Sequence, residues 1–279
     1  MARGWTTGDG RAGLLGRRSC LRAGAAAVWL AALAGGRGAL AKPLVAGDDK
    51  RIAARTLTLA AASGPLQCYY VRPASLRGKA PAVLLVHESR GRTDYVEDVA
   101  RRLAVAGYHV LAPDFLSPRG GTPATDADRA REIAGALEND QVAADAVAAM
   151  VWLLALPDGN GKVGAVGFAW GGSVVGRLAV LAPALAAGVV FYARPPQPKD
   201  AAQIKAALLF HHAAENQRSV EAAPAFEAAL KAAGVPFESH TYAGVGASFH
   251  NDTADKKFDA AAAQLAWERT LAFLKARLG

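Results

Sequence analysis

The sequence is short of cysteine and of aromatic side chains. Of its two cysteines, only Cys68 lies outside the first 41 residues, and aromatic residues make up 7% of the chain. A lone cysteine cannot form an internal disulfide, so residues 42–279 are no disulfide scaffold, and we expect Cys68 to be a small buried residue in a strand. No spacing of histidines, cysteines and carboxylates matches a metal site, so we predict neither a metal nor another cofactor.

The chain also lacks concentrated charge. Its net charge is +8, but residues 1–41 contain six arginines and one aspartate, so residues 42–279 carry only +3. No basic stripe is present, which argues against nucleic acid as a partner.

The N-terminal 41 residues have the features of an export signal. A twin arginine, Arg17-Arg18, precedes Leu21, and an apolar stretch at 23–33 leads to the small-x-small sequence 39–41. The stretch is too short to span a bilayer. We predict a twin-arginine signal cut after Ala41, which places residues 42–279 in the periplasm or outside the cell, with no stable membrane span after cleavage. The alternative is an uncleaved amphiphilic anchor.

The hydrophobic pattern of residues 42–279 alternates between strands and helices. Residues 56–60 and 66–72 look like a hairpin. Strands are then predicted at 83–87, 108–112, 163–168, 188–192, 206–211 and 235–242, and helices at 95–106, 140–156, 171–181, 222–233 and 259–278. This order predicts a single α/β domain with a mostly parallel sheet covered by helices on both faces. The longest irregular segment, 114–128, is expected to shape the ligand crevice.

One strand-to-helix junction has the pattern of a catalytic turn. Residues 164–173 read GAVGFAWGGS, an apolar strand followed by glycines that lead into a helix. A nucleophile elbow, G-x-S-x-G, has this setting and raises one side chain above the sheet. The raised position here is Ala169, whose methyl group can neither attack nor form a hydrogen bond.

Several segments together resemble the dienelactone hydrolase family of α/β-hydrolases. The matching segments are V-H-E at 86–88, D-V-A-R-R-L at 98–103, L-A-P-D at 111–114, G-F-A-W-G-G at 167–172, F-H-N-D-T at 249–253 and L-A-W-E-R-T at 265–270. The resemblance covers residues 55–276. It implies an α/β-hydrolase fold and, in the family, a Cys-Asp-His triad that cleaves esters or lactones.

The same resemblance places the three triad positions, and all three are substituted. The nucleophile position is Ala169. The family pattern H-Y-A-G-x-D-x-R aligns with residues 211–218 and places Asn216 at the acid, while Y-P-G-x-x-H-x-F aligns with 242–249 and places Ala247 at the base.

Other parts of the family site are expected to persist. Glu88 matches the glutamate that partners the family nucleophile at rest. The backbone N–H groups of Ser89 and Trp170 are expected to form an oxyanion hole, because backbone donors survive the loss of side chains. The helix that begins near Gly171 adds a positive dipole end, so the pocket should favour an anion or a polarised carbonyl.

Some neighbouring residues are candidates for replacing the lost groups. Ser248 and His250 flank the base position, and Glu88 is a candidate general base on water. The alternatives are a structural or rim role for His250 and a solvated or salt-bridged role for Glu88. Ser173 should point away from the raised position, and Glu215 should face away from the acid site.

Two functions therefore remain open at this point. The first is a non-catalytic relative that binds a small molecule with a carbonyl or carboxylate group. The second is an ester or lactone hydrolase that uses Glu88, Ser248 and His250 as rearranged catalytic groups. Nothing in the sequence points to a protein partner.

Overall fold

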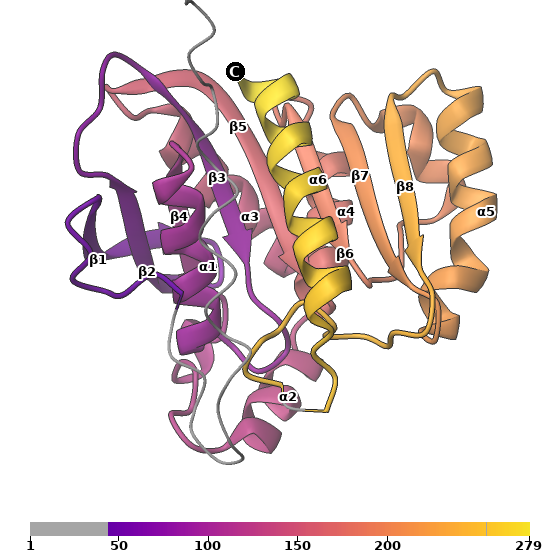
Figure 1. Ribbon diagram of the computed structural model, residues 1–279, viewed down its shortest axis with the longest axis horizontal. Coiled ribbons are helices and arrows are strands. Elements are labelled where there is room, and N and C mark those ends of the chain that lie inside the picture. The colour runs from indigo at the N-terminus through magenta and orange to yellow at the C-terminus, as the bar shows by residue number, and fades with distance from the viewer. Residues whose placement is uncertain (1–43, 255) are drawn as a thin grey trace, which may run out of the picture. The chain divides into compact units, whose positions relative to one another are not determined.

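A hairpin opens the fold, as predicted. The computed structural model describes residues 44–254 and 256–279, so the predicted export signal lies outside the described residues. Strand β1 (Ile52–Ala61) pairs antiparallel with β2 (Gly64–Pro73), and β2 pairs antiparallel with β4 (His109–Asp114). The hairpin thereby forms one edge of a larger sheet (Figure 1).

The described chain forms one eight-stranded sheet in the order β1-β2-β4-β3-β5-β6-β7-β8. The remaining strands are β3 (Ala80–Val86), β5 (Gly159–Phe168), β6 (Ala187–Phe191), β7 (Ala207–Ala213) and β8 (Phe237–Tyr242). All pairings from β4 to β8 are parallel. The predicted fold class, a mostly parallel α/β sheet, is confirmed.

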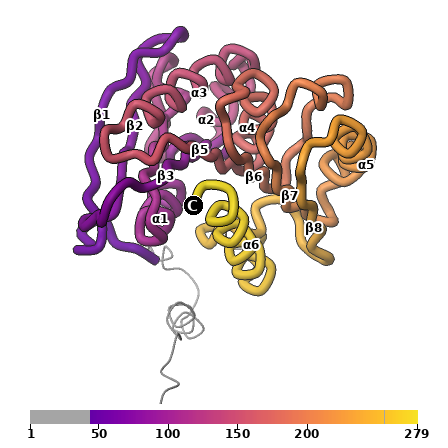
Figure 2. Tube along the Cα trace, turned by 90° about the horizontal axis from the view of Figure 1, so that it is seen from above, coloured from indigo at the N-terminus to yellow at the C-terminus, as the bar shows by residue number. Residues whose placement is uncertain are grey.

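Helices cover both faces of this sheet (Figure 2). One face carries α1 (Asp94–Val105) and α6 (Ala260–Leu278), and the other carries α3 (Asn139–Leu154), α4 (Trp170–Leu181) and α5 (Gln217–Ala232). Two short 3₁₀ helices, η1 (Ser117–Arg119) and η2 (Pro198–Gln203), lie in connections. The central strands are consequently buried on both sides, which explains why β3 reads as a continuous apolar run.

Cys68 on β2 is fully buried. Burial raises the pKa of its thiol to about 12, so the thiolate is not formed at neutral pH. The expectation of a small buried residue is confirmed.

One helix was not predicted from the sequence, and another is longer than predicted. Helix α2 (Ala127–Gly135) follows the 114–128 segment, capped by Asp126, whose side chain accepts a hydrogen bond from the N–H of Arg129. Only three of its residues are buried, so the apolar periodicity that reveals longer helices is weak here. Helix α5 begins at Gln217 rather than at 222, directly after Asn216.

Neither α6 nor any other helix within 44–254 and 256–279 has both the length and the apolar character that a membrane crossing requires.

Candidate functional site

The turn between β5 and α4 has an unusual backbone. Ala169 lies between the two elements with φ 48° and ψ −115°, and its N–H donates to the carbonyl of Phe191 at 3.0 Å. An alanine in this region of φ/ψ space is strained by about 1–3 kcal/mol. The structure thus contains the sharp strand-to-helix turn that the glycine-rich sequence predicted, with a methyl group at its apex.

Three glycines make this turn possible because the backbone around them is too close for a side chain. A Cβ on Gly167 would lie 2.3 Å from the carbonyl oxygen of Gly171, and a Cβ on Gly171 would lie 2.3 Å from that of His87. A Cβ on Gly172 would lie 2.6 Å from the Cβ of Ala193. The shape of the turn therefore depends on its glycines and not on the side chain at 169.

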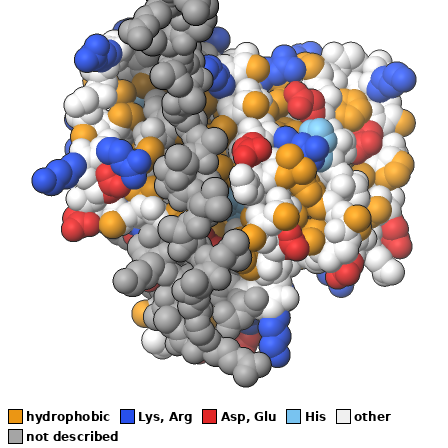
Figure 3. Space-filling view, in the orientation of Figure 1, with side chains coloured by type: hydrophobic (Ala, Val, Ile, Leu, Met, Phe, Trp, Pro, Cys, Tyr) orange, Lys and Arg blue, Asp and Glu red, His pale blue; other side chains and the backbone are white. Residues whose placement is uncertain are grey.

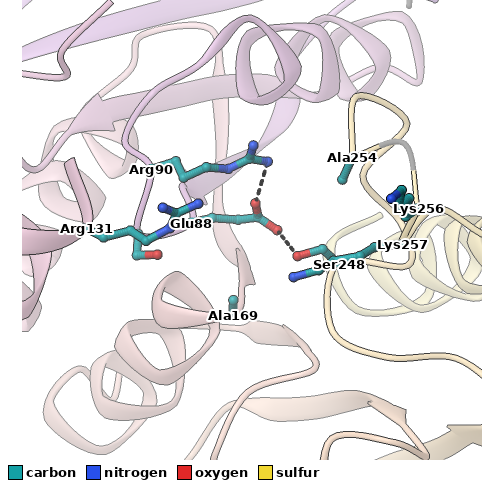
Figure 4. Close-up of a pocket in the computed structure, with 9 residues that line it drawn as sticks. Glu88, Arg90, Arg131, Ala169, Ser248, Ala254, Lys256 and Lys257 are labelled. Atoms are coloured by element: carbon teal, nitrogen blue, oxygen red, sulfur yellow. Dashed lines mark hydrogen bonds and ion pairs between the residues drawn. The ribbon is translucent and has the colours of Figure 1, made fainter. Parts of the chain in front are cut away.

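A cavity of about 360 Å³ opens beside Ala169 at the carboxyl ends of β3 and β5 (Figure 4). In a parallel α/β sheet this is the edge at which ligands bind. Its lining combines four cationic side chains, one carboxylate and small residues: Glu88, Ser89, Arg90, Arg131, Ala169, Ser248, Ala254, Lys256 and Lys257.

Glu88 is the carboxylate of the cavity, and four side chains donate to it. The Tyr192 hydroxyl reaches Oε1 and Asn251 Nδ2 reaches Oε2, each at 3.2 Å. Two weaker contacts come from residues of the cavity wall, Ser248 Oγ at 3.5 Å and Arg90 Nη2 at 3.4 Å. Glu88 is therefore buried and hydrogen-bonded, with its weaker partners on the side open to a ligand.

Backbone strain is concentrated around this carboxylate. Among the described residues, the non-glycine residues with positive φ are Ala169, Tyr192 at 38° and Ser248 at 73°. Ala169 lines the cavity, and the other two donate to Glu88. Strain of this kind persists only when the surrounding structure enforces it, and it clusters at binding and active sites.

Of the two predicted oxyanion-hole donors, one belongs to a residue that lines the cavity and the other to the residue after Ala169. Ser89 is one of its lining residues. Trp170 is the first residue of α4, so its N–H has no acceptor within the helix, while its ring stacks on His87 at 5.4 Å between centroids. That these two N–H groups bind a ligand oxygen remains a prediction.

The expected acid and base positions lie next to the cavity wall rather than in it. Asn216 occupies the N-cap position of α5 without a side-chain cap hydrogen bond, and it donates from Nδ2 to the carbonyl of Tyr192 at 2.8 Å. Ala247 is half-buried and directly precedes Ser248. Glu215 is exposed, and its Oε2 would lie 3.6 Å from a Cβ on Gly246, next to Ala247. Ser173 points away from the turn and donates to the carbonyl of Arg194.

The structure does not bring His250 into the cavity. Its ring is 2% exposed, its Nδ1 lies 2.7 Å from the Tyr95 hydroxyl, and it packs among aromatic rings that include Phe168 and Trp267. Burial, with a smaller contribution from Arg102, lowers the pKa of His250 to about 3. His250 is therefore placed as a neutral histidine in the core, which agrees with the structural role given above as the alternative to catalysis.

His211 and His212 are neighbours on β7, where successive side chains point to opposite faces of the sheet. His211 contacts Tyr242 and Thr270, whereas His212 contacts Ser219 on α5, so the two rings face opposite sides of the sheet. The described residues contain no cluster of three or more potential metal ligands.

Several site residues were missed by the sequence analysis: Tyr192, Asn251, Arg131, Lys256 and Lys257. Only Asn251 carried a signal, because it belongs to the F-H-N-D-T segment at 249–253.

The strand order, the strained turn and the cavity at the carboxyl edge of the sheet define an α/β-hydrolase fold. The sequence profile of the dienelactone hydrolase family matches residues 66–278, so the chain belongs to that family.

Known relatives agree with this assignment. A Methylorubrum extorquens (strain AM1) protein named "Putative carboxymethylenebutenolidase" is 30% identical over 247 residues, which cover 82% of this chain and 83% of that protein. The Escherichia coli (strain K12) "Putative hydrolase fragment YghX" is 49% identical over 87 residues, 30% of this chain and 74% of that protein. A crystal structure of a "Putative Dienelactone Hydrolase" from Klebsiella pneumoniae subsp. pneumoniae MGH 78578 has a TM-score of 0.71 at 26% identity and covers 79% of this chain and 97% of its own.

Proposed function

We propose that residues 42–279 form a non-catalytic member of the dienelactone hydrolase family that binds a small carbonyl or carboxylate compound in the cavity beside Ala169. One observation carries this proposal. The strained turn between β5 and α4 and the cationic cavity beside it are both present, although the residue at the apex of the turn is Ala169, which has only a methyl group. The N-terminus of α4 and the cavity's arginines favour a negatively charged or polarised oxygen.

The triad-equivalent positions offer no covalent chemistry. Ala169 supplies neither a nucleophile nor a proton, and Ala247 supplies no base. Asn216 uses its amide as a donor to Tyr192, so it does not hold a histidine in place as a carboxylate would.

A second candidate function is hydrolysis through Glu88 and Ser248. The observation in its favour is that both residues line the cavity and lie 3.5 Å apart, Oγ to Oε1. Against it, Tyr192 and Asn251 already occupy lone pairs of the carboxylate that a general base would offer to water.

We also propose that residues 1–41 export the protein through the twin-arginine route, on the strength of the sequence pattern alone. Replacing Arg17 and Arg18 by lysine should retain the full-length chain in the cytoplasm. Cell fractionation of the two forms tests this, and equal export of both would exclude the route.

The decisive experiment compares residues 42–279 with the repaired variant Ala169→Cys/Asn216→Asp/Ala247→His on activated esters and lactones. Because the turn and the cavity are already in place, we expect turnover only in the repaired chain, at least about 10³-fold above the unrepaired one. A variant repaired at 169 and 216 but not at 247 is the matched control, since it has a thiol without its base.

The outcome separates the two candidate functions. Steady turnover by the unrepaired chain that is lost in Glu88→Gln would establish the hydrolase and overturn the binder. Flat progress curves together with thermal stabilisation by small carboxylates support the binder.

A further inference from the structure

The cationic side chains of the cavity come from two sides of it. Arg90 follows β3 and Arg131 projects from α2, whereas Lys256 and Lys257 belong to the segment before α6. In Figure 4 Arg131 lies to the left of the Glu88 carboxylate and the guanidinium of Arg90 lies above it. The two lysines come from the right, and Ala169 lies below. A ligand in the cavity is therefore flanked by positive charge at both ends.

Positive charge is concentrated at the cavity and not over the visible face of the molecule. On the visible part of the face in Figure 3, basic and acidic side chains are interspersed with apolar ones. Among the described residues that line the cavity, by contrast, four cations accompany one carboxylate, Glu88.

The two arginines of the cavity already have ion-pair partners, and the two lysines have none within the described residues. Arg90 contacts Glu88 at 3.4 Å, and Arg131 pairs with Asp128, whose side chain is almost fully exposed, so solvent screens that pair. Lys256 and Lys257 are exposed and form no ion pair with any residue in the described ranges. A ligand with one anionic group would compensate the positive charge on one side of the cavity and leave that on the other side uncompensated.

We propose that the ligand of this cavity is a short dianion, with one anionic group held by Arg90 and Arg131 and the other by Lys256 and Lys257. This inference rests on the proposed binding function and specifies its ligand class as a dicarboxylate whose two groups are joined by a short apolar chain. The volume of about 360 Å³ lies at the small end of ligand sites and limits that chain to a few carbons.

The test is calorimetric titration of residues 42–279 with adipate and with hexanoate at equal ionic strength. The two acids have the same chain length and differ in one carboxylate. We expect adipate to bind about tenfold more tightly, with the preference shrinking as salt is raised.

Variants test whether the preference for adipate depends on the two lysines. In Lys256→Gln/Lys257→Gln the tenfold preference should disappear, so that the variant binds adipate and hexanoate with equal affinity. The matched control, Lys162→Gln/Lys275→Gln, removes the same charge from exposed positions outside the cavity lining and should retain the tenfold preference.

The results distinguish this inference from the function on which it rests. Equal affinity for adipate and hexanoate in the unmodified chain overturns the dianion and leaves the binding function intact. An unchanged preference in the cavity-lysine variant also overturns it. No binding of adipate, hexanoate or the neutral ester methyl hexanoate would overturn the binding function itself.

Discussion

Two cavities of similar size lie at opposite edges of the same sheet. The first, about 360 Å³, is beside Ala169 at the carboxyl ends of the parallel strands. The second, about 330 Å³, lies at their amino ends, between the β1–β2 hairpin and the turn that precedes β5, and is lined in part by Arg55, Tyr70 and Asp158. None of the residues lining the second cavity has a positive φ, whereas three strained residues surround Glu88 at the first.

This difference shows that volume alone does not identify a functional site. Both cavities contain arginines and a carboxylate. Only the first combines backbone strain, converging donors and the edge of the sheet at which α/β folds bind ligands. The second is explained by packing: the Tyr70 hydroxyl lies 2.7 Å from Nδ1 of the buried His109, and the Tyr70 ring meets Trp152 edge-on.

The largest expected effect concerns stability at the second cavity. Tyr70→Ala removes a buried ring and should lower the free energy of unfolding by about 3 kcal/mol. Tyr70→Phe, which loses only the hydroxyl contact to His109, should cost about 1 kcal/mol. Denaturant unfolding measures both, and ligand affinity at the first cavity should not change. If the Tyr70→Phe protein lost ligand binding, the second cavity would not have a purely structural role.

The next effect concerns pH and the core behind the first cavity. His250 has a native pKa of about 3 against 6.5 in the unfolded chain, so the unfolded state takes up its proton first and stability falls as pH drops below about 6.5. The loss between pH 6.5 and 5 should be about 2 kcal/mol from His250 alone. Burial also lowers the pKa of His87 and His211, which adds loss in the same direction.

Urea unfolding at a series of pH values tests this dependence. The variant Tyr95→Phe/His250→Phe removes the titrating ring together with its hydroxyl partner and should reduce proton uptake on unfolding by about one. An unchanged pH slope in that variant would show that His250 is not the buried group responsible.

The smallest effect compares two alanine-to-glycine changes. At Ala169 the φ of 48° strains an alanine, so Ala169→Gly should raise the free energy of unfolding by about 1 kcal/mol. At Ala53, in an ordinary strand that lines the second cavity, the same change should lower it by about 0.5–1 kcal/mol. Thermal unfolding distinguishes opposite signs readily, and two losses of equal size would show that the turn at 169 is unstrained.

The sequence predicted what depends on local pattern. The buried strands, the flanking helices and the glycine turn all follow from periodicity and from residues that are neighbours along the chain. The family resemblance added the site positions at 169, 216 and 247.

Contacts between distant segments could not be read in the same way. Glu88 meets Tyr192 from 104 residues away and Asn251 from 163 residues away, and no local signal marks either pair. His250 was expected near the base position because it lies three residues past Ala247. The chain turns at Ser248, where φ is 73°, and His250 lies in the aromatic core instead.

The close backbone packing of Gly167, Gly171 and Gly172 has a practical consequence for protein engineering. Those contacts define the turn whatever side chain stands at 169. A side chain placed at that position therefore faces the cationic cavity. Serine, selenocysteine or a cysteine carrying a spectroscopic label can be installed there without redesigning the backbone. The methyl group at the apex of this turn therefore marks a position at which a chosen reactive group can be placed.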